Sequence, residues 1–163
     1  MENIKTAIKL FAEISNKLSL KDIKYLLYGS VAYFLYTRDE QAEINDIDII
    51  VKEKDFDKIM EIFDNFELPY KFFRTKHNLH ANHLNIKMND GKPFDISFDS
   101  FEYYFKDHGI RMGRLKKFII SETEIKTVIL EDLIKIYKLG VCGRNLDKIK
   151  EYERKLCILE LIE

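Results

Sequence analysis

Residues Tyr25–Val51 read YLLYGSVAYFLYTRDEQAEINDIDIIV, and their pattern indicates the fold of the whole chain. The first four of these residues, YLLY, form a short apolar run that predicts a strand, and this strand ends at Gly29-Ser30. An apolar, helix-like segment and a polar loop follow, and the stretch closes on the strand-like sequence NDIDIIV. The predicted order is therefore strand, Gly-Ser step, helix, loop and strand.

Asp46 and Asp48 occupy alternate positions of the last of these strands. Side chains alternate between the faces of a strand, so the two carboxylates point the same way, about 7 Å apart, while Ile47 and Ile49 point into the core. Leaving two such carboxylates unpaired is costly, and a divalent cation is the simplest remedy. Mg²⁺ takes oxygen ligands and keeps open positions for substrate phosphates. A solvated strand edge is the alternative, but the apolar flanks favour a central, buried strand.

The Gly29-Ser30 step suits a phosphate, because glycine permits close approach of the backbone and the next helix offers unpaired N–H groups. Alone, such a step is most often an ordinary turn and helix cap. Arg38, in the following loop, is the only cation near the motif and is a candidate to contact a phosphate, with a solvated loop charge as the alternative. Together with the two carboxylates, the step indicates a metal–triphosphate site.

This order of elements resembles the nucleotidyltransferases of the DNA polymerase β type, including their antibiotic-modifying and toxin–antitoxin members. The resemblance covers roughly residues 24–152. It implies an α+β fold (two-layer α/β), with a central mixed sheet covered by helices and a C-terminal helical segment. It also implies transfer of a nucleoside monophosphate from a nucleoside triphosphate such as ATP to a hydroxyl group. Gly29 and Ser30 would hold the β- and γ-phosphates, and Asp46 and Asp48 would bind Mg²⁺, with Mn²⁺ as an alternative.

The third metal-binding carboxylate of this superfamily lies on a neighbouring strand. Asp-Gly at positions 90 and 91 separates two strand-like runs and predicts a hairpin. In the second run Asp95 shares a face with Ser97, opposite the apolar residues. The resemblance therefore assigns Asp95 as the third metal ligand and as a catalytic base, with Asp99 as second choice. The alternative is that Asp95 faces water on a one-sided sheet.

Two helices are predicted after residue 130, and here the resemblance recurs. The sequence is similar to the family segment L-E-D-L-I-x-x-K-L followed by G-R-x-x-D. The resemblance implies that Lys138 and Arg144 face the nucleotide phosphates and that Asp147 orients them. Lys135 is the alternative to Lys138, because the helical register is one residue off the family pattern. Ordinary solvated charges are the alternative for each.

Length and composition predict a single domain over residues 1–163, with a core at about 20–129 and a helical part at about 130–163. Hydrophobic content of 46% and charged content of 34% are typical of a globular protein. The chain lacks an apolar run of the roughly 20 residues that a membrane span needs. Its N-terminus lacks the features of a signal peptide, and its two cysteines form no disulfide framework. We therefore expect a cytoplasmic protein without membrane contact.

The acceptor is open among a small molecule, a protein side chain and an RNA end, and a partner protein or a homo-oligomer is compatible with the sequence. One rival is a catalytically inactive, regulatory or toxin–antitoxin module that binds a partner through the aromatic segment Phe101–Phe105. Another is an RNA-binding adaptor that uses the basic run Arg111–Lys117, although such a run is more often a solvated strand edge. With 27 basic and 28 acidic residues, the chain has no global attraction for nucleic acid. Metal dependence separates the three hypotheses.

Overall fold

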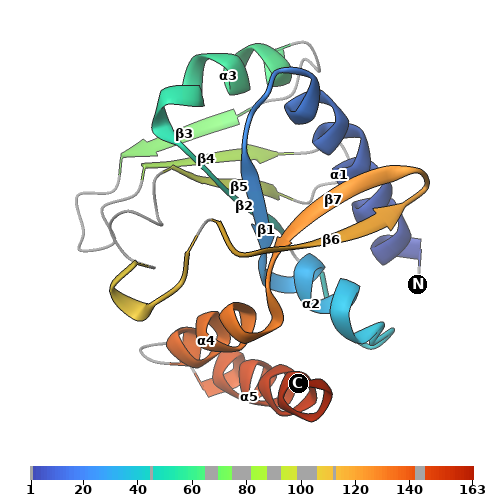
Figure 1. Ribbon diagram of the computed structural model, residues 1–163. Helices are drawn as coiled ribbons and strands as arrows, with labels where there is room; N and C mark the ends of the chain where they lie inside the picture. Colours follow the sequence, from blue (N-terminus) through green and yellow to red (C-terminus); the bar gives the residue numbers. More distant parts are fainter. Residues whose placement is uncertain are drawn as a thin grey trace.

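A computed structural model describes residues 2–44, 46–64, 70–74, 82–87, 93–98, 106–111, 113–141 and 146–163. Its strands form one mixed sheet in the order β3-β4-β5-β2-β1-β7-β6 (Figure 1). The strands are β1 (Tyr25–Tyr28), β2 (Ile47–Val51), β3 (Tyr70–Arg74), β4 (Asn82–Lys87), β5 (Pro93–Phe98), β6 (Leu115–Ile120) and β7 (Thr123–Val128). The α-helices are α1 (Glu2–Leu20), α2 (Gly29–Thr37), α3 (Phe56–Asp64), α4 (Leu130–Val141) and α5 (Leu146–Ile162). Short 3-10 turns lie at Glu53–Asp55 and Lys106–His108. The predicted α+β class, with a central mixed sheet and a C-terminal helical segment, is confirmed.

The middle of the sheet is the strand pair β1 and β2, which run antiparallel. On its other edge β2 pairs with β5 in parallel, so β2 is a central strand as predicted. Ile47, Ile49, Ile50 and Val51 are all buried, which leaves Asp48 as the one polar side chain within this strand. Apolar residues that alternate to both faces are typical of a strand covered on both sides.

The remaining predicted strands are found, with different bounds. The expected hairpin is the antiparallel pair β4 and β5. Strands β6 and β7 also form an antiparallel pair, with Leu115 opposite Val128 at one end and Ile120 opposite Thr123 at the other. Ser121 and Glu122 both take positive φ in the tight turn between them, which lets pairing continue up to Ile120 and Thr123. Asp46 lies directly before β2, although the sequence analysis placed it inside the strand.

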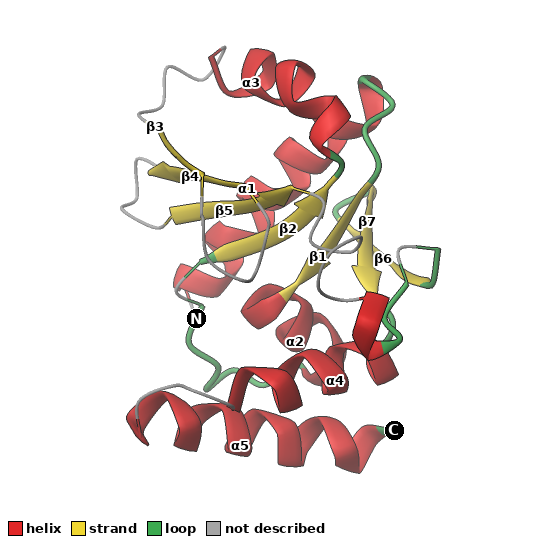
Figure 2. Cartoon of the chain, turned by 90° about the vertical axis from the view of Figure 1, so that its left-hand side faces the viewer, coloured by secondary structure: helices red, strands yellow, loops and turns green. Residues whose placement is uncertain are grey.

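The helices pack around this sheet in two groups. Helix α1 contacts β7 and α3, and its residues Phe11, Ile14 and Leu18 are fully buried. Helix α2 contacts β1 and β2 as well as α4 and α5, so it connects the sheet to the C-terminal helices. Figure 2 shows α4 and α5 side by side beyond the end of the sheet where β1 runs into α2. None of the described helices is long and apolar enough to cross a membrane.

The loop between α2 and β2 is tied to α5 through Asp39. The Tyr33 hydroxyl and the Arg154 guanidinium each donate a hydrogen bond of 2.8 Å to Asp39 Oδ2. The backbone N–H of Gln41 donates to Oδ1 at 3.0 Å. Burial raises the pKa of Asp39, but the bonds from Arg154, Tyr33 and Gln41 outweigh it and hold this pKa below its ordinary value. Burial and the Asp39 carboxylate raise the pKa of Tyr33 to about 12, so this hydroxyl stays a donor. These bonds hold α5 against the loop that leads to Asp46.

We expect Asp39→Asn to lower the free energy of unfolding by about 1–2 kcal/mol at pH 7, because two donors lose a charged acceptor. The folded-state pKa of Asp39 is lowered, so its contribution is complete above the ordinary carboxyl pKa of about 4 and is lost as pH falls through the folded-state value. The difference between wild type and variant should therefore shrink at pH 3. Urea unfolding at both pH values measures this, with the exposed Asp57→Asn as the control. A difference that does not depend on pH would contradict the assignment.

Candidate active site

The junction of β1 and α2 lies directly against Asp48. Gly29, the first residue of α2, has a φ of +67°, a conformation that favours glycine. A Cβ at this position would overlap the Asp48 carboxylate, with the Asp48 Cγ only 2.9 Å away. The antiparallel register, in which Tyr28 pairs with Asp48, brings the two together. Glycine is therefore required here both by the backbone angle and by the packing.

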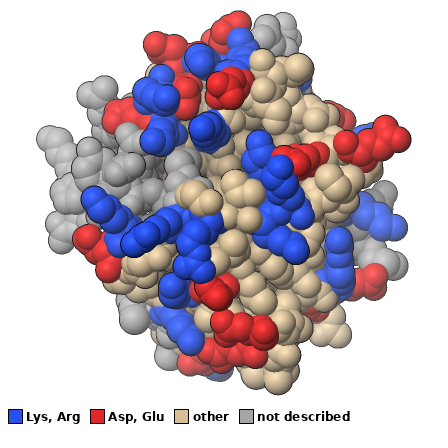
Figure 3. Space-filling view, in the orientation of Figure 1, with Lys and Arg blue, Asp and Glu red and all other residues tan. Residues whose placement is uncertain are grey.

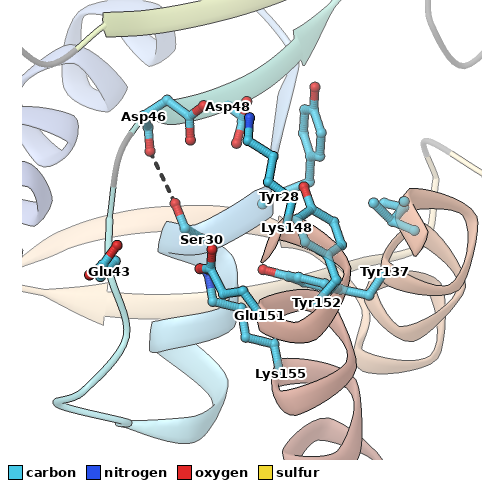
Figure 4. A pocket seen from close by; sticks show the side chains of 13 residues that line it. Tyr28, Ser30, Glu43, Asp46, Asp48, Tyr137, Lys148, Glu151, Tyr152 and Lys155 are labelled. Atoms are coloured by element: carbon cyan, nitrogen blue, oxygen red, sulfur yellow. Dashed lines mark hydrogen bonds and ion pairs between the residues drawn. The ribbon is translucent and has the colours of Figure 1, made fainter. Parts of the chain in front are cut away.

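Ser30 does not act as the helix cap that the simplest interpretation of the Gly-Ser step predicts. The cap position of α2 is Tyr28, and no side chain caps the helix there. Instead the Ser30 hydroxyl donates a hydrogen bond of 3.2 Å to the backbone carbonyl of Asp46 (Figure 4). The N-terminus of α2 thus keeps N–H groups without a side-chain cap, and Ser30 fixes the backbone just before β2.

The two carboxylates open onto a cavity of about 360 Å³. Gly29, Ser30, Asp46 and Asp48 form its wall on the side of the sheet, and Figure 4 shows the two aspartates side by side. Glu43, from the loop before β2, lines the same space. The structure thus brings the Gly-Ser step and both aspartates into one cavity.

The opposite wall comes from α4 and α5, with tyrosines prominent in it. Tyr137 and Tyr152 line the cavity with their ring centroids 5.0 Å apart. Gly140 makes this packing possible, because a Cβ there would overlap the Tyr152 ring, whose Cδ1 would lie at 2.8 Å. Burial raises the pKa of the Tyr137 hydroxyl well above its ordinary value, and the neighbouring Tyr152 and the Asp48 carboxylate raise it further. Tyr137 is therefore a neutral hydrogen-bond donor near Asp48.

Two lysines of α5, Lys148 and Lys155, also line the cavity. Lys155 is only 3% exposed, and its Nζ lies 2.6 Å from Glu151 Oε1 and 5.6 Å from the centre of the Tyr33 ring. Lys148 is exposed and points from α5 toward Asp48 (Figure 4). Neither lysine was among the site residues predicted from the sequence. Their spacing could have indicated that they lie together, because residues 148, 151, 152 and 155 share one face of a helix.

The lysines chosen from the family pattern lie elsewhere. Lys138 is exposed and pairs with Glu160 at 2.8 Å, and Lys135 pairs with the buried Asp132 at 3.5 Å. Neither lines the cavity, whereas Tyr137, between them in sequence, does. Positions 135 and 138 share a face of α4 that is turned away from the cavity. The one-residue difference between the helical register and the family pattern therefore places Tyr137, and neither lysine, in the cavity wall.

Of the other candidates, Arg38 is exposed, and its guanidinium carbon lies 5.8 Å from the centre of the Phe34 ring, outside the cavity lining. Asp95 pairs with Asp48 in the parallel register of β5 and β2, so its backbone lies next to the site. The side chains of Asp95 and Asp147 lie outside the described part of the structure, as does Arg144. The described residues alone contain no group of three or more metal-ligating side chains.

The charges of the described lining residues favour a cation. Four carboxylates, those of Glu43, Asp46, Asp48 and Glu151, face two lysines, which leaves a formal charge of 2 − 4 = −2. Carboxylate oxygens are the ligands that Mg²⁺ and Mn²⁺ prefer. The donor set of Asp46 and Asp48 therefore fits the metal that the resemblance implies.

No protein-family profile matches the chain, and no curated protein matches its sequence. Solved structures do match. The antibiotic-resistance factor ANT(2″)-Ia superposes with a TM-score of 0.65 at 13% identity, over 97% of this chain and 89% of its own. It has also been solved in complex with adenylyl-2″-tobramycin. The lincosamide antibiotic adenylyltransferase LnuA, solved with lincomycin bound, gives a TM-score of 0.64 at 14% identity, over 100% of this chain and 98% of its own.

A nucleotidyltransferase-like protein from Paracoccidioides brasiliensis, described as antigenic, also superposes, with a TM-score of 0.60 at 13% identity. That match covers 98% of this chain and 76% of the other. The chain therefore has the fold of the nucleotidyltransferase superfamily, and this confirms the resemblance found in the sequence. At these identities the likeness establishes the fold.

We expect Gly29→Ala to lower the free energy of unfolding by about 2 kcal/mol or more, because a side chain is strained at positive φ and would overlap the Asp48 carboxylate. Urea unfolding measures the effect. Gly113→Ala is the matched control, since nothing lies within 4 Å of a Cβ at that position. Equal stability of the two variants would contradict the close approach of Gly29 and Asp48.

Proposed function

We propose that the protein is a Mg²⁺-dependent nucleotidyltransferase, which transfers a nucleoside monophosphate from a nucleoside triphosphate to an acceptor hydroxyl. The observation that carries this proposal is the shared cavity. It combines two adjacent carboxylates, the N-terminus of α2 at Gly29-Ser30, and lysine ammonium groups on the facing helix. A hard cation and a polyphosphate need these three kinds of group.

In this proposal Asp46 and Asp48 hold the metal, Mg²⁺ or alternatively Mn²⁺. Asp95, whose backbone is paired with that of Asp48, is the third ligand. When bound, the metal would neutralise charge on the triphosphate and stabilise the leaving pyrophosphate. The two oxygen-rich side chains, and the glycine that leaves room for one of them, are the features of this chain that support such a site.

The phosphates would lie at the N-terminus of α2. N–H groups there have no side-chain cap and face negative charge favourably. Gly29 and Ser30 are the proposed contacts for the β- and γ-phosphates. Arg144, which precedes α5 in the sequence, and Asp147, in the first turn of α5, stay in the proposal as residues that face and orient the phosphates.

The reaction would be an in-line displacement. The acceptor oxygen forms a bond to the α-phosphorus, the bond from the α-phosphorus to the pyrophosphate oxygen breaks, and the acceptor proton passes to a carboxylate, for which Asp95 is the candidate. Among the acceptors, a small molecule has the most support. Two neighbours with almost the same extent as this chain are solved with an antibiotic or an adenylylated antibiotic.

The rival RNA-binding hypothesis gains little support from the surface. Two of the four charges in the basic run are paired, Arg114 with Glu131 and Asp132, and Lys117 with Glu124 at 3.0 Å. Basic and acidic side chains lie close together over much of the face in Figure 3. The aromatic segment proposed for partner binding, Phe101–Phe105, lies outside the described residues, as does Asp99. The catalytic hypothesis therefore has the stronger physical basis.

Calorimetry with each of the four ribonucleoside triphosphates, with and without Mg²⁺, tests the proposal. We expect Mg²⁺-dependent binding, and we expect Asp46→Asn/Asp48→Asn to weaken it by about a hundredfold or more, because the ligands of a doubly charged ion are lost. Transfer of label from an α-labelled triphosphate should fall about a thousandfold.

The exposed Asp57→Asn controls for the loss of negative charge and should bind as the wild type does. If none of the four triphosphates binds at millimolar concentration, the catalytic proposal is wrong, and the chain is a binding module with a nucleotidyltransferase fold.

A further inference from the structure

Lys148 and Asp48 belong to opposite walls of the cavity, yet one side chain reaches toward the other. Lys148 lies in the first turn of α5, and Asp48 is in the central strand β2. Both line the same space, and Figure 4 shows the Lys148 side chain extending across it toward Asp48. The ammonium group thus approaches the carboxylate on which the metal proposal depends.

The surroundings of Asp48 restrict where its carboxylate can meet a second cation. Gly29 packs against it so closely that a single added carbon would overlap it. The buried ring of Tyr137 lies near enough for the Asp48 charge to raise the pKa of its hydroxyl, after the larger effects of burial and Tyr152. The carboxylate also faces the cavity, and Lys148 points toward it from that side. An ammonium and a divalent cation at one carboxylate repel each other.

The two cavity lysines differ in their freedom to move. Lys155 is 3% exposed and is held by Glu151 at 2.6 Å, so its position is fixed by packing. Lys148 is exposed, and its side chain has a flexible four-carbon stem with three donors. Lys148 can therefore turn from the carboxylate to another anion in the cavity without disturbing the core.

We propose that Lys148 is a displaceable counter-ion of Asp48. A divalent cation at Asp48 drives the Lys148 ammonium away from this carboxylate, and a bound triphosphate then accepts it. The first half concerns the free protein alone, and only the second half rests on the proposed function. Bound metal therefore raises the affinity of the protein for the nucleotide, and bound nucleotide raises its affinity for the metal. This coupling depends on Lys148 and adds to the direct attraction between the metal and the nucleotide.

The first test is Mn²⁺ binding to the nucleotide-free protein, measured by electron paramagnetic resonance of the free ion. Lys148→Met should bind Mn²⁺ about tenfold more tightly than the wild type, because a competing positive charge is removed. The matched control is Lys150→Met, which removes the same charge from an exposed site on α5 outside the cavity lining. Its Mn²⁺ affinity should stay within about twofold of that of the wild type. Lys148→Arg keeps the charge and should also resemble the wild type.

The second test is triphosphate binding at saturating Mg²⁺, measured by calorimetry. Lys148→Met should bind the nucleotide about tenfold more weakly, although it binds the metal more tightly, because the phosphates lose a charged donor. This opposite change in the two affinities is not expected of a variant that is merely destabilised. Urea unfolding of each variant verifies that it is folded.

The proposal is overturned if Lys148→Met binds Mn²⁺ no more tightly than the wild type, or if Lys150→Met gains as much. It is also overturned if none of these proteins binds Mn²⁺ at millimolar concentration. Tighter Mn²⁺ binding without any nucleotide binding would support the counter-ion role and refute the proposed transferase function, so failure of one is distinguishable from failure of the other.

Discussion

The close contact between Gly29 and the Asp48 carboxylate is the constraint on which the candidate site depends. It follows from one antiparallel register, in which the last residue of β1 pairs with the polar position of β2. Because the chain turns into α2 immediately after β1, the same register sets the N-terminus of a helix beside a carboxylate. A helix N-terminus attracts anions and a carboxylate attracts cations, so a single backbone junction offers both halves of a metal–phosphate site. Ser30 strengthens the junction by holding the backbone of Asp46.

The C-terminal helices complete the site from outside the sheet. Helix α2 contacts both of them, and the bonds of Asp39 to Tyr33 and Arg154 fix α5 to the loop that enters β2. Gly140 allows the ring of Tyr152 to pack against α4, which brings the two helices close where they face the carboxylates. The side of the sheet contributes the Asp46 and Asp48 carboxylates, and α5 contributes two lysines together with Glu151. The cavity is consequently a place where cations and phosphates can each find an oppositely charged partner.

The parts of this account that the sequence predicted are those set by short-range rules. The strand period of two, the Gly-Ser step and the apolar flanks were enough to predict β1, α2, the central strand β2 and the cavity carboxylates Asp46 and Asp48. Lys148 and Lys155 were missed, because their entry into the site depends on how α5 packs against α4, which no local pattern determines. Arg38 ends α2 in the left-handed region and lies over the Phe34 ring. It is close to the Gly-Ser step in sequence, but it does not line the cavity.

A crystal structure of the protein with Mn²⁺ and a non-hydrolysable α,β-methylene triphosphate would show where the metal and the phosphates bind, because the anomalous signal of manganese locates the metal independently of the protein phases. We expect a manganese peak on Asp46 and Asp48, with the β- and γ-phosphates at the N-terminus of α2 between Gly29-Ser30 and Lys148. A manganese peak away from these carboxylates, or a triphosphate bound outside the cavity between the sheet and the two C-terminal helices, would contradict this expectation.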